Sequence, residues 1–400
     1  MELILQMRHG MQGMAHDLIK IWGNGKIIIS PINFIHPSAE SVKKLSEKIQ
    51  SVNGEVLFDP QMFYPKEGHH KLRVYDYWPQ EGVSISSTDA YRSINQEIMR
   101  LNNNINSSMI ILPGIEMNES TLGYGINRLK ESSVYFREKT DKPLLGTLCL
   151  YPETIRNASV IEYLVEQLKE VPIDGYYIIP HPSNNEYIVS DPLWMIGILK
   201  LVTCLKLSKR IVYVGYSNHQ GLLYSLAKVD GIASGSYMNT RSFVPSKFKS
   251  PKDDDVKHKS TWYYMPSAFS EYKAALLDVA KQRGFLEKFV PQGEFANDFS
   301  SMLFKGAMPS STNYNETSSF KHYLHCLKMQ CELLSKSTYK ETYDTYEFLL
   351  NTAENNIKEF KRHGLSGQNR DFAPAIEANR VAMVSNNEDY GLKLTLDWLK

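Results

Sequence analysis

The fold is decided by a run that stops at a proline, Val56-Leu57-Phe58-Asp59-Pro60. Seven other stretches repeat this junction, in which a short apolar run ends at a proline or at a Gly, Asn or Ser turn and a helical stretch follows. The eight runs cover residues 27–30, 56–59, 109–112, 144–151, 176–179, 211–215, 231–236 and 261–265. Apolar runs that alternate with helices are typical of parallel strands buried on both faces. Eight of them predict a closed (β/α)8 TIM barrel over residues 26–265.

The segments between these runs have helical patterns. Within residues 38–52, Val42, Leu45 and Ile49 recur at helical spacing after Ser38, a good N-cap, and residues 157–171 repeat the design. Residues 191–207 are nearly all apolar, which predicts a helix between the barrel and an appendage. Residues 318–363 predict two more helices and residues 390–399 an amphipathic one. We therefore expect an α/β protein with a barrel over 1–287 and a C-terminal helical region over 288–400 packed on it.

Composition excludes several classes of protein. A chain with 42% hydrophobic and 22% charged residues is typical of a soluble globular protein. No apolar run reaches the roughly 18 residues that cross a bilayer, and residues 1–10 lack the order of a signal peptide. We expect a cytoplasmic protein without a membrane partner. The four cysteines, 149, 204, 326 and 331, lack disulfide-framework spacing, and the net charge of +1 leaves a nucleic-acid partner open.

Asp59 is the sharpest candidate for chemistry. An acid at the tip of an apolar strand is costly unless it has partners or a task, and chemistry in a TIM barrel lies at the carboxyl ends of the strands. Asp59 could act as a nucleophile or a general base, or grip a purine edge with two hydrogen bonds. It could instead accept hydrogen bonds within its own turn. Gln61, two residues later, is a candidate substrate ligand.

Three later strand ends carry further candidates for substrate binding. His181, held between Pro180 and Pro182, could be an acid, a base or a ligand, or only structural. Asn218 and His219 open the helix after the sixth strand, where exposed amides could hold a phosphate or where Asn218 only caps the helix. The seventh strand ends in a polar run whose candidates are Ser234, Gly235, Asn239 and Arg241. Arg241 could bind phosphate through two hydrogen bonds, or lie on a surface turn.

Lysines follow Arg241 on the same expected rim. Lys247, Lys249 and Lys257 are candidates for contact with a nucleic-acid backbone, although Asp253, Asp254 and Asp255 dilute the positive charge. We expect no bound metal, because His322, His325, Cys326 and Cys331 lack the spacing of common zinc sites. No phosphate-cradling Gly-rich loop follows a strand, so we expect no cofactor.

Residues 174–241 resemble the tRNA-guanine transglycosylase superfamily, whose members exchange guanine for a 7-deazapurine in a polynucleotide on a (β/α)8 barrel. The resemblance rests on Asp174-Gly175-Tyr176, Tyr213-Val214-Gly215, Leu222-Leu223, Val229-Asp230 and Asn239-Thr240-Arg241. It extends weakly to Tyr323-Leu324-His325, and the span from Asp174 to His325 is about a third of the chain. The branch that modifies DNA is the one most similar.

Two features depart from that family. The family's nucleophilic aspartate falls on Gly235, and its Cys-x-Cys-x-x-Cys zinc motif is absent. The resemblance implies that Asp59 corresponds to the strand-end aspartate that meets the base. It also implies a transglycosylase-like pentosyltransferase that uses a covalent carboxylate intermediate, with DNA or tRNA and a 7-deazapurine base as partners.

Two other functions stay open. The chain could be a noncatalytic nucleic-acid-binding subunit, alone or within a homo- or hetero-oligomer, which the missing nucleophile would suit. It could also be an unrelated barrel hydrolase or lyase acting on a small molecule. A basic rim around a wide aromatic cleft would favour a nucleic-acid substrate, and a closed pocket with clustered His and Asp would favour a small molecule.

Overall fold

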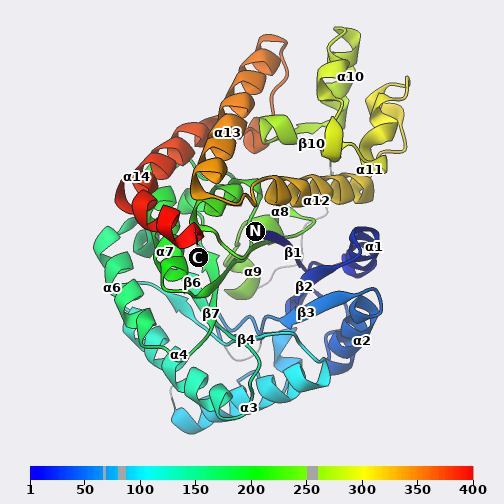
Figure 1. The fold of residues 1–400 in the computed structure, drawn as a ribbon. Helices are drawn as coiled ribbons and strands as arrows, with labels where there is room; N and C mark the ends of the chain where they lie inside the picture. Colours follow the sequence, from blue (N-terminus) through cyan, green and yellow to red (C-terminus); the bar gives the residue numbers. More distant parts are fainter. Residues whose placement is uncertain (66–68, 80–86, 250–259, 400) are drawn as a thin grey trace.

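A computed structural model of the chain describes residues 1–65, 69–79, 87–249 and 260–399. Eight parallel strands follow one another in chain order around a nearly closed barrel (Figure 1). They are β1 (Glu2–Gln6), β2 (Gly25–Ile29), β3 (Gly54–Phe58), β4 (Ile110–Leu112), β6 (Leu144–Leu150), β7 (Gly175–Pro180), β8 (Ile211–Val214) and β9 (Gly231–Ser234). Between β3 and β4, where the sheet ends meet, the Ser108 amide donates to the Val56 carbonyl at 3.0 Å. The fold is α/β, a TIM-like barrel followed by helices.

Seven of the eight predicted runs are barrel strands, but one barrel strand was not predicted and one predicted barrel strand lies elsewhere. The first barrel strand is β1, which has buried Leu3, Ile4 and Leu5 but no proline or turn residue directly after it. The prediction of an eighth strand at 261–265 fails, because β10 (Trp262–Met265) pairs antiparallel with β11 (Ser270–Lys273) outside the barrel. A short apolar run is compatible with either kind of strand, and only tertiary contacts select its partner. The barrel strands therefore run from residue 2 to residue 234.

Helices cover the outside of the barrel, most of them where the sequence predicts. Ser38 caps α2 by accepting from the Ser41 amide at 3.1 Å, and Asp191 caps α7. The apolar α7 lies between the barrel and α14, where the Thr203 hydroxyl donates to Asn386 at 2.8 Å. The helices are α1 (Gln12–Trp22), α2 (Ala39–Gln50), α3 (Thr88–Asn104), α4 (Leu122–Arg137), α5 (Pro152–Arg156), α6 (Ala158–Lys169) and α7 (Pro192–Leu207). A 3₁₀ helix, residues His219–Ala227, takes the next place.

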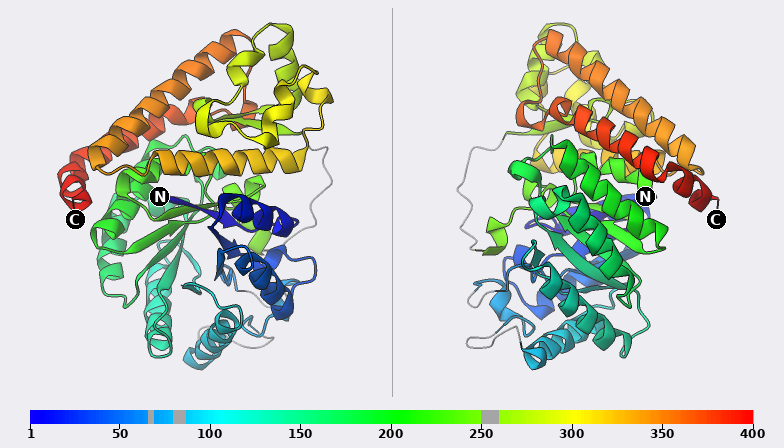
Figure 2. Two further views of the ribbon diagram at one scale, coloured as in Figure 1. Left: turned by 45° about the vertical axis from the view of Figure 1, so that its right-hand side comes forward. Right: turned by 90° about the vertical axis from the view of Figure 1, so that its left-hand side faces the viewer.

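The C-terminal part stands on one side of the barrel. The helix α12 lies beside β1, and α13 and α14 run antiparallel to each other (Figure 2). Its elements are the β10–β11 ribbon, α10 (Ala274–Gln282), α11 (Asp298–Ser301), α12 (Glu316–Leu333), α13 (Tyr339–Arg362) and α14 (Ala373–Trp398). The predicted boundary at residue 287 stays a prediction.

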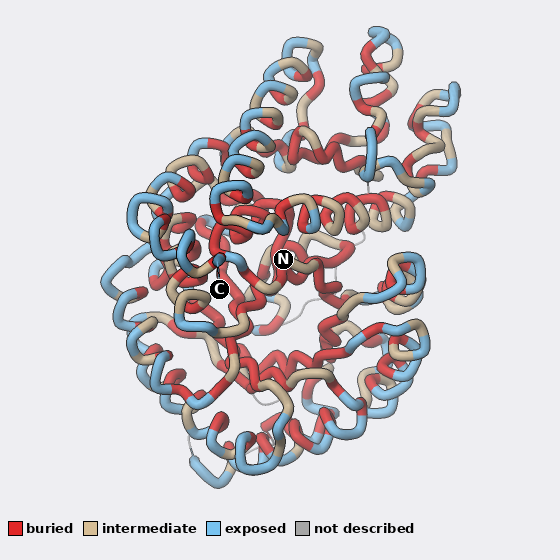
Figure 3. Tube along the Cα trace, viewed as in Figure 1, coloured by how far each residue is buried: buried red, intermediate tan, exposed pale blue. Residues whose placement is uncertain are grey.

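Buried residues follow the strands and the inner faces of the helices, while exposed residues line the outer helix faces (Figure 3). Within the described ranges, no helix is both long enough and apolar enough to cross a bilayer. The carboxyl ends of the strands meet at the barrel mouth, where the end of β1 and the loops after β2, β3, β7 and β8 contribute buried polar side chains. This mouth is the place where the fold positions chemistry.

Candidate functional site

Strand register shows which side chains point into the barrel. The Tyr177 hydroxyl on β7 donates to Gln6 Oε1 on β1 at 3.0 Å, and these strands are not neighbours, so both side chains cross the interior. Side chains two residues apart on a strand share a face. Tyr177 pairs with Thr147 on β6, so Cys149, two residues after Thr147, also points into the barrel. His181, four residues after Tyr177, does the same. Together these side chains make the upper layer of the barrel polar.

Asp59 lies in this layer, with no exposed surface. Its backbone continues β3, because its amide donates to the Ile29 carbonyl at 3.0 Å. Its Oδ1 accepts from the Gln61 amide at 2.9 Å, whereas Oδ2 has no hydrogen bond from the part of the chain that the structure describes. Burial raises the pKa of Asp59 to about 7, and the Gln61 amide and the nearby Tyr177 hydroxyl oppose that rise. Asp59 is thus a carboxyl that can gain or lose a proton near neutral pH.

Two carboxamides flank Asp59. Gln6 donates to the Ser30 hydroxyl at 3.1 Å. Gln61 accepts from the Ile32 amide at 3.1 Å and donates to the Tyr216 hydroxyl at 3.0 Å, so it links the loops after β3 and β8 across the mouth. Gln61 and Tyr216 have φ angles of 55° and 49°, a left-handed conformation that side chains other than Gly and Asn seldom adopt. Backbone strain of this kind is concentrated at functional sites.

Aromatic rings close the mouth over Asp59. The ring centroid of Phe63 lies 5.3 Å from that of Phe243 and 5.0 Å from that of Phe248, and Tyr216 packs edge-on against Phe243 at 5.2 Å. All four rings are buried. We call these four rings the aromatic roof (Phe63, Tyr216, Phe243 and Phe248). Because Asp59 has no exposed surface, a ligand can reach it only if side chains around it move.

A second acid lies in the same mouth, and the sequence analysis missed it. Glu116 belongs to β5 (Glu116–Met117) and lies opposite Cys149 in the register with β6. Its Oε1 accepts from the Tyr64 hydroxyl and lies 3.0 Å from His181 Nε2. Burial, together with the nearby positive charge of Lys249, lowers the pKa of His181 to about 3, so this histidine is neutral at pH 7 and the contact is a hydrogen bond. In the sequence, Pro113-Gly114 directly after the strand at 109–112 indicates a turn, and this turn could have directed attention to the residues that follow it, including Glu116.

The structure places Ser234 and His219 away from the interior. Ser234 pairs with Leu5 in the register, one position from Gln6, so its side chain faces outward, near Tyr323 of α12. The His219 ring is fully buried among Tyr264, Phe372 and other aromatic rings, and burial lowers its pKa to about 4. Neither side chain contributes to the mouth in this structure.

Asn218 and Asn239 have local roles. Asn218 accepts from the Gln220 amide at 2.8 Å and donates to the Tyr187 carbonyl at 2.6 Å, so the capping role is present. Asn239 accepts from Arg8 at 2.7 Å on the rim. Gly235 faces the interior next to Gln6, and a Cβ there would lie 2.2 Å from Thr240 Oγ1 and 2.5 Å from the Gln6 carbonyl oxygen. No side chain fits at that position without a rearrangement.

Arg241 is a buried structural residue in this fold, with 1% of its surface exposed. Its guanidinium donates to the carbonyls of Gly235 at 2.8 Å and Ser236 at 2.9 Å, and to Glu271 at 3.2 Å. Arg370 also donates to Glu271, at 2.6 Å. A phosphate could contact Arg241 only after these bonds broke. The prediction of an exposed Arg241 that binds phosphate is therefore wrong for this structure. The guanidinium instead joins the segment after β9 to Glu271 of the β10–β11 ribbon.

The basic candidates lie beside the roof. Lys249 is exposed, with its Nζ 4.4 Å from the centre of the Tyr64 ring, and Lys247 is partly exposed. Lys257 lies outside the described residues. Within the described ranges, no three His, Cys, Asp or Glu side chains gather as metal ligands would.

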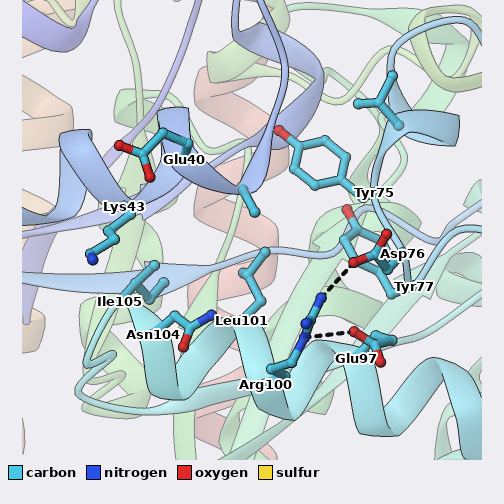
Figure 4. Close-up of a pocket in the computed structure, with 12 residues that line it drawn as sticks. Glu40, Lys43, Tyr75, Asp76, Tyr77, Glu97, Arg100, Leu101, Asn104 and Ile105 are labelled. Atoms are coloured by element: carbon cyan, nitrogen blue, oxygen red, sulfur yellow. Dashed lines mark hydrogen bonds and ion pairs between the residues drawn. The ribbon is translucent and has the colours of Figure 1, made fainter.

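A separate pocket of about 290 Å³ lies between α2, α3 and residues 74–77 (Figure 4). There Arg100 bridges Asp76 at 2.5 Å and Glu97 at 2.9 Å, beside Glu40 and Lys43. The other two charged lining residues have partners outside the pocket, since Glu40 pairs with Lys44 and Lys43 with Glu47. None of the predicted site residues lines this pocket, and the mouth remains the candidate site.

No protein-family model and no curated protein sequence matches this chain. The resemblance to tRNA-guanine transglycosylases therefore stays a hypothesis.

Proposed function

We propose that the protein is an enzyme that exchanges a purine base at a glycosidic carbon, with its active site at the barrel mouth and Asp59 as proton donor and acceptor. The observation that carries this proposal is the buried Asp59 carboxyl, whose pKa is raised to about 7 and whose Oδ2 accepts no hydrogen bond from the described residues. A general acid–base works best with a pKa near the working pH. Base exchange needs such a group, because the leaving base gains a proton and the incoming base loses one.

The surroundings of Asp59 suit a purine. Carboxamides such as those of Gln6 and Gln61 carry a donor and an acceptor side by side, which matches the hydrogen-bonding edge of a base. Aromatic rings provide stacking surfaces for a base that has left its helix. Lys247 and Lys249 lie next to the roof, where a polynucleotide backbone would pass. On this proposal the polymer is DNA or tRNA and the incoming base a 7-deazapurine.

A second candidate is a barrel hydrolase or lyase that acts on a small molecule. The closed mouth favours it, because Asp59 has no exposed surface and Glu116 contacts His181 in the same mouth, where both side chains are largely buried. A free nucleoside or another small ring could be enclosed there entirely, whereas a polymer has to open the roof.

Incorporation of a labelled base tests the proposal. The purified protein is incubated with labelled 7-deazaguanine and, in separate reactions, duplex DNA, single-stranded DNA and bulk tRNA. We expect label in one polymer, and a loss of at least about 100-fold for Asp59→Asn, because removal of an acid–base group costs roughly 10²- to 10⁴-fold. Asp141→Asn, at an exposed position, is the control and should keep full activity.

If no polymer takes up label, the base-exchange proposal is wrong. Release of base from free nucleosides would then support the small-molecule enzyme. Full exchange by a folded Asp59→Asn protein would remove Asp59 from the mechanism.

A further inference from the structure

The position where the resemblance places a nucleophile cannot hold one here. Gly235 faces the interior, but its backbone lies against Thr240 and the Gln6 carbonyl, with distances of 2.2 and 2.5 Å to an added Cβ. Distances under 3 Å to a backbone atom leave no room for a carboxylate side chain. A nucleophile for base exchange must come from another strand end.

Two acids of the described chain meet in the upper layer of the barrel, Asp59 and Glu116. Burial raises the pKa of Cys149, and the negative charges of Glu116 and Asp59 raise it further; Cys149 lies directly opposite Glu116 in the strand register. Both carboxyls are therefore near the same thiol on β6. Glu116 is the more accessible, with 12% of its side chain exposed compared with none for Asp59.

Two hydrogen-bond donors orient the side chain of Glu116. Tyr64 donates to Oε1, and His181 does so in the tautomer that carries its proton on Nε2. Both donors are neutral near pH 7, so they orient the carboxylate without the strong attraction of a cation. Both contacts go to Oε1, which leaves Oε2 without a hydrogen bond from the described residues. Burial raises the pKa of Asp59 to about 7, which suits an acid–base group and weakens a nucleophile.

We propose that Glu116 is the nucleophile and that Tyr64 and His181 position it, an inference that rests on the proposed base exchange. Retaining glycosyl transfer uses such a pair of carboxyls, one as nucleophile and one as acid–base. A nucleophile on β5 also explains how the chain could keep the chemistry with glycine at position 235.

The two half-reactions balance. A Glu116 oxygen forms a bond to C1′ while the bond from C1′ to the purine nitrogen breaks, and the leaving nitrogen takes the electron pair together with a proton from Asp59. The incoming base then gives its proton to the Asp59 carboxylate and attacks C1′. The bond between C1′ and Glu116 breaks, and its electron pair restores the Glu116 carboxylate.

Trapping the covalent intermediate tests Glu116. The protein is incubated without an incoming base on an oligonucleotide of the active sequence, denatured, and analysed by intact-mass and peptide mass spectrometry. We expect an adduct on the peptide that contains Glu116. Glu116→Gln should form none and should lose at least about 100-fold in base exchange, while Glu119→Gln, an exposed acid on the same loop, should behave as the wild type.

A substrate with an activated leaving group separates the two acids. 7-Methylguanine carries a positive charge and leaves without protonation, so Asp59→Asn should form the adduct from a 7-methylguanine oligonucleotide within about tenfold of the wild-type rate. Glu116→Gln should not. In Glu116→Ala, added azide should take the place of the missing carboxylate and attack C1′, so that 7-methylguanine is released and a glycosyl azide forms. If Glu116 had only a structural role, azide would not restore release of the base.

Three results would overturn the inference and leave base exchange intact: an adduct on Asp59 or any other residue, base exchange by folded Glu116→Gln within tenfold of the wild type, or no azide product from folded Glu116→Ala. Absence of both adduct and exchange in the wild-type protein would instead refute the proposed function.

Discussion

Asp59 shows how a single residue reveals a site. A carboxyl without exposed surface loses its hydration, and only the Gln61 amide and the nearby Tyr177 hydroxyl offset that loss. A protein that needed only a well-packed barrel would gain stability from an apolar side chain at this place. The buried acid therefore supports the proposed acid–base role.

The pKa of Asp59 predicts a pH-dependent stability. Because the pKa rises from 3.8 in the unfolded chain to about 7 in the fold, the folded protein binds more protons between these values, and stability falls as the pH rises through that window. Asp59→Asn should remove this loss. At pH 8 we expect the variant to melt at a higher temperature than the wild type, with an unfolding free energy larger by an amount on the order of a few kcal/mol, as the pKa shift implies. At about pH 3, below the unfolded pKa, the two proteins should melt at nearly the same temperature.

Calorimetry at both pH values measures the effect, with Asp141→Asn as the exposed control. Equal melting temperatures of wild type and Asp59→Asn at pH 8 would mean that burial does not disfavour the ionised form of Asp59 in the folded protein.

Arg241 is expected from the sequence to bind phosphate or to lie on a surface turn, but in the structure it is buried and bonded to Glu271. Arg241→Ala should lower the unfolding free energy by about 3–5 kcal/mol, the usual effect of breaking a buried ion pair, because Glu271 and two carbonyls lose a donor. The exposed Arg92→Ala should change it by less than about 0.5 kcal/mol. Urea unfolding measures both. An Arg241→Ala protein of normal stability that binds polymer poorly would restore the phosphate-contact interpretation.

At the scale of elements, the strand ends hold the site through close packing. Gly215, which follows β8, lies against the Tyr177 ring, and a Cβ added to it would be 2.5 Å from Tyr177 Oη. The contact fixes Tyr177 where its hydroxyl reaches Gln6. Glycine here is required by space, because its φ is not in the left-handed region.

Gly215→Ala should therefore displace Tyr177, cost about 1–3 kcal/mol of stability, as overpacking does, and reduce activity. Gly123→Ala on α4, where nothing lies within 4 Å of the added Cβ, should be neutral or stabilising by up to about 1 kcal/mol. Thermal melting and base incorporation are measured on both variants. A Gly215→Ala protein that matches Gly123→Ala in both respects would show that the Tyr177 contact has no role.

At the scale of the whole molecule, the open question is what approaches the mouth. The aromatic roof closes it, and Lys247 and Lys249 lie beside the roof on the segment after β9. Polynucleotide binding would use these charges, whereas a small neutral substrate would not.

If the lysines follow a phosphate backbone, oligonucleotide affinity should fall steeply with salt. Replacing Lys247, Lys249 and Lys257 by alanine together should flatten the slope of log affinity against log salt by roughly one unit per lost contact. The same change at Lys43, Lys44 and Lys48 on α2, all exposed, is the matched control. Fluorescence anisotropy from low to moderate salt gives the slopes. Binding no tighter than that of a neutral control protein would exclude both nucleic-acid functions.

Local patterns in the sequence determined most of the barrel. The apolar runs at β2, β3, β4, β6, β7, β8 and β9 are strands, and α2, α6 and α7 begin and end close to the predicted residues. These features depend on alternation, spacing and capping, which neighbouring residues alone decide. The strand end at Asp59 could be located for the same reason.

Only the tertiary structure decided which strands pair and which side chains meet. The place of β1 in the barrel, the antiparallel partner of β10 and the Glu116–His181 contact all join residues that neither sequence spacing nor residue type connects. Arg241 and Glu271 are 30 residues apart, and nothing near Arg241 announces that it is buried. Local sequence sets the shape of each element, but closure of the barrel sets the direction of each side chain, and with it the chemistry.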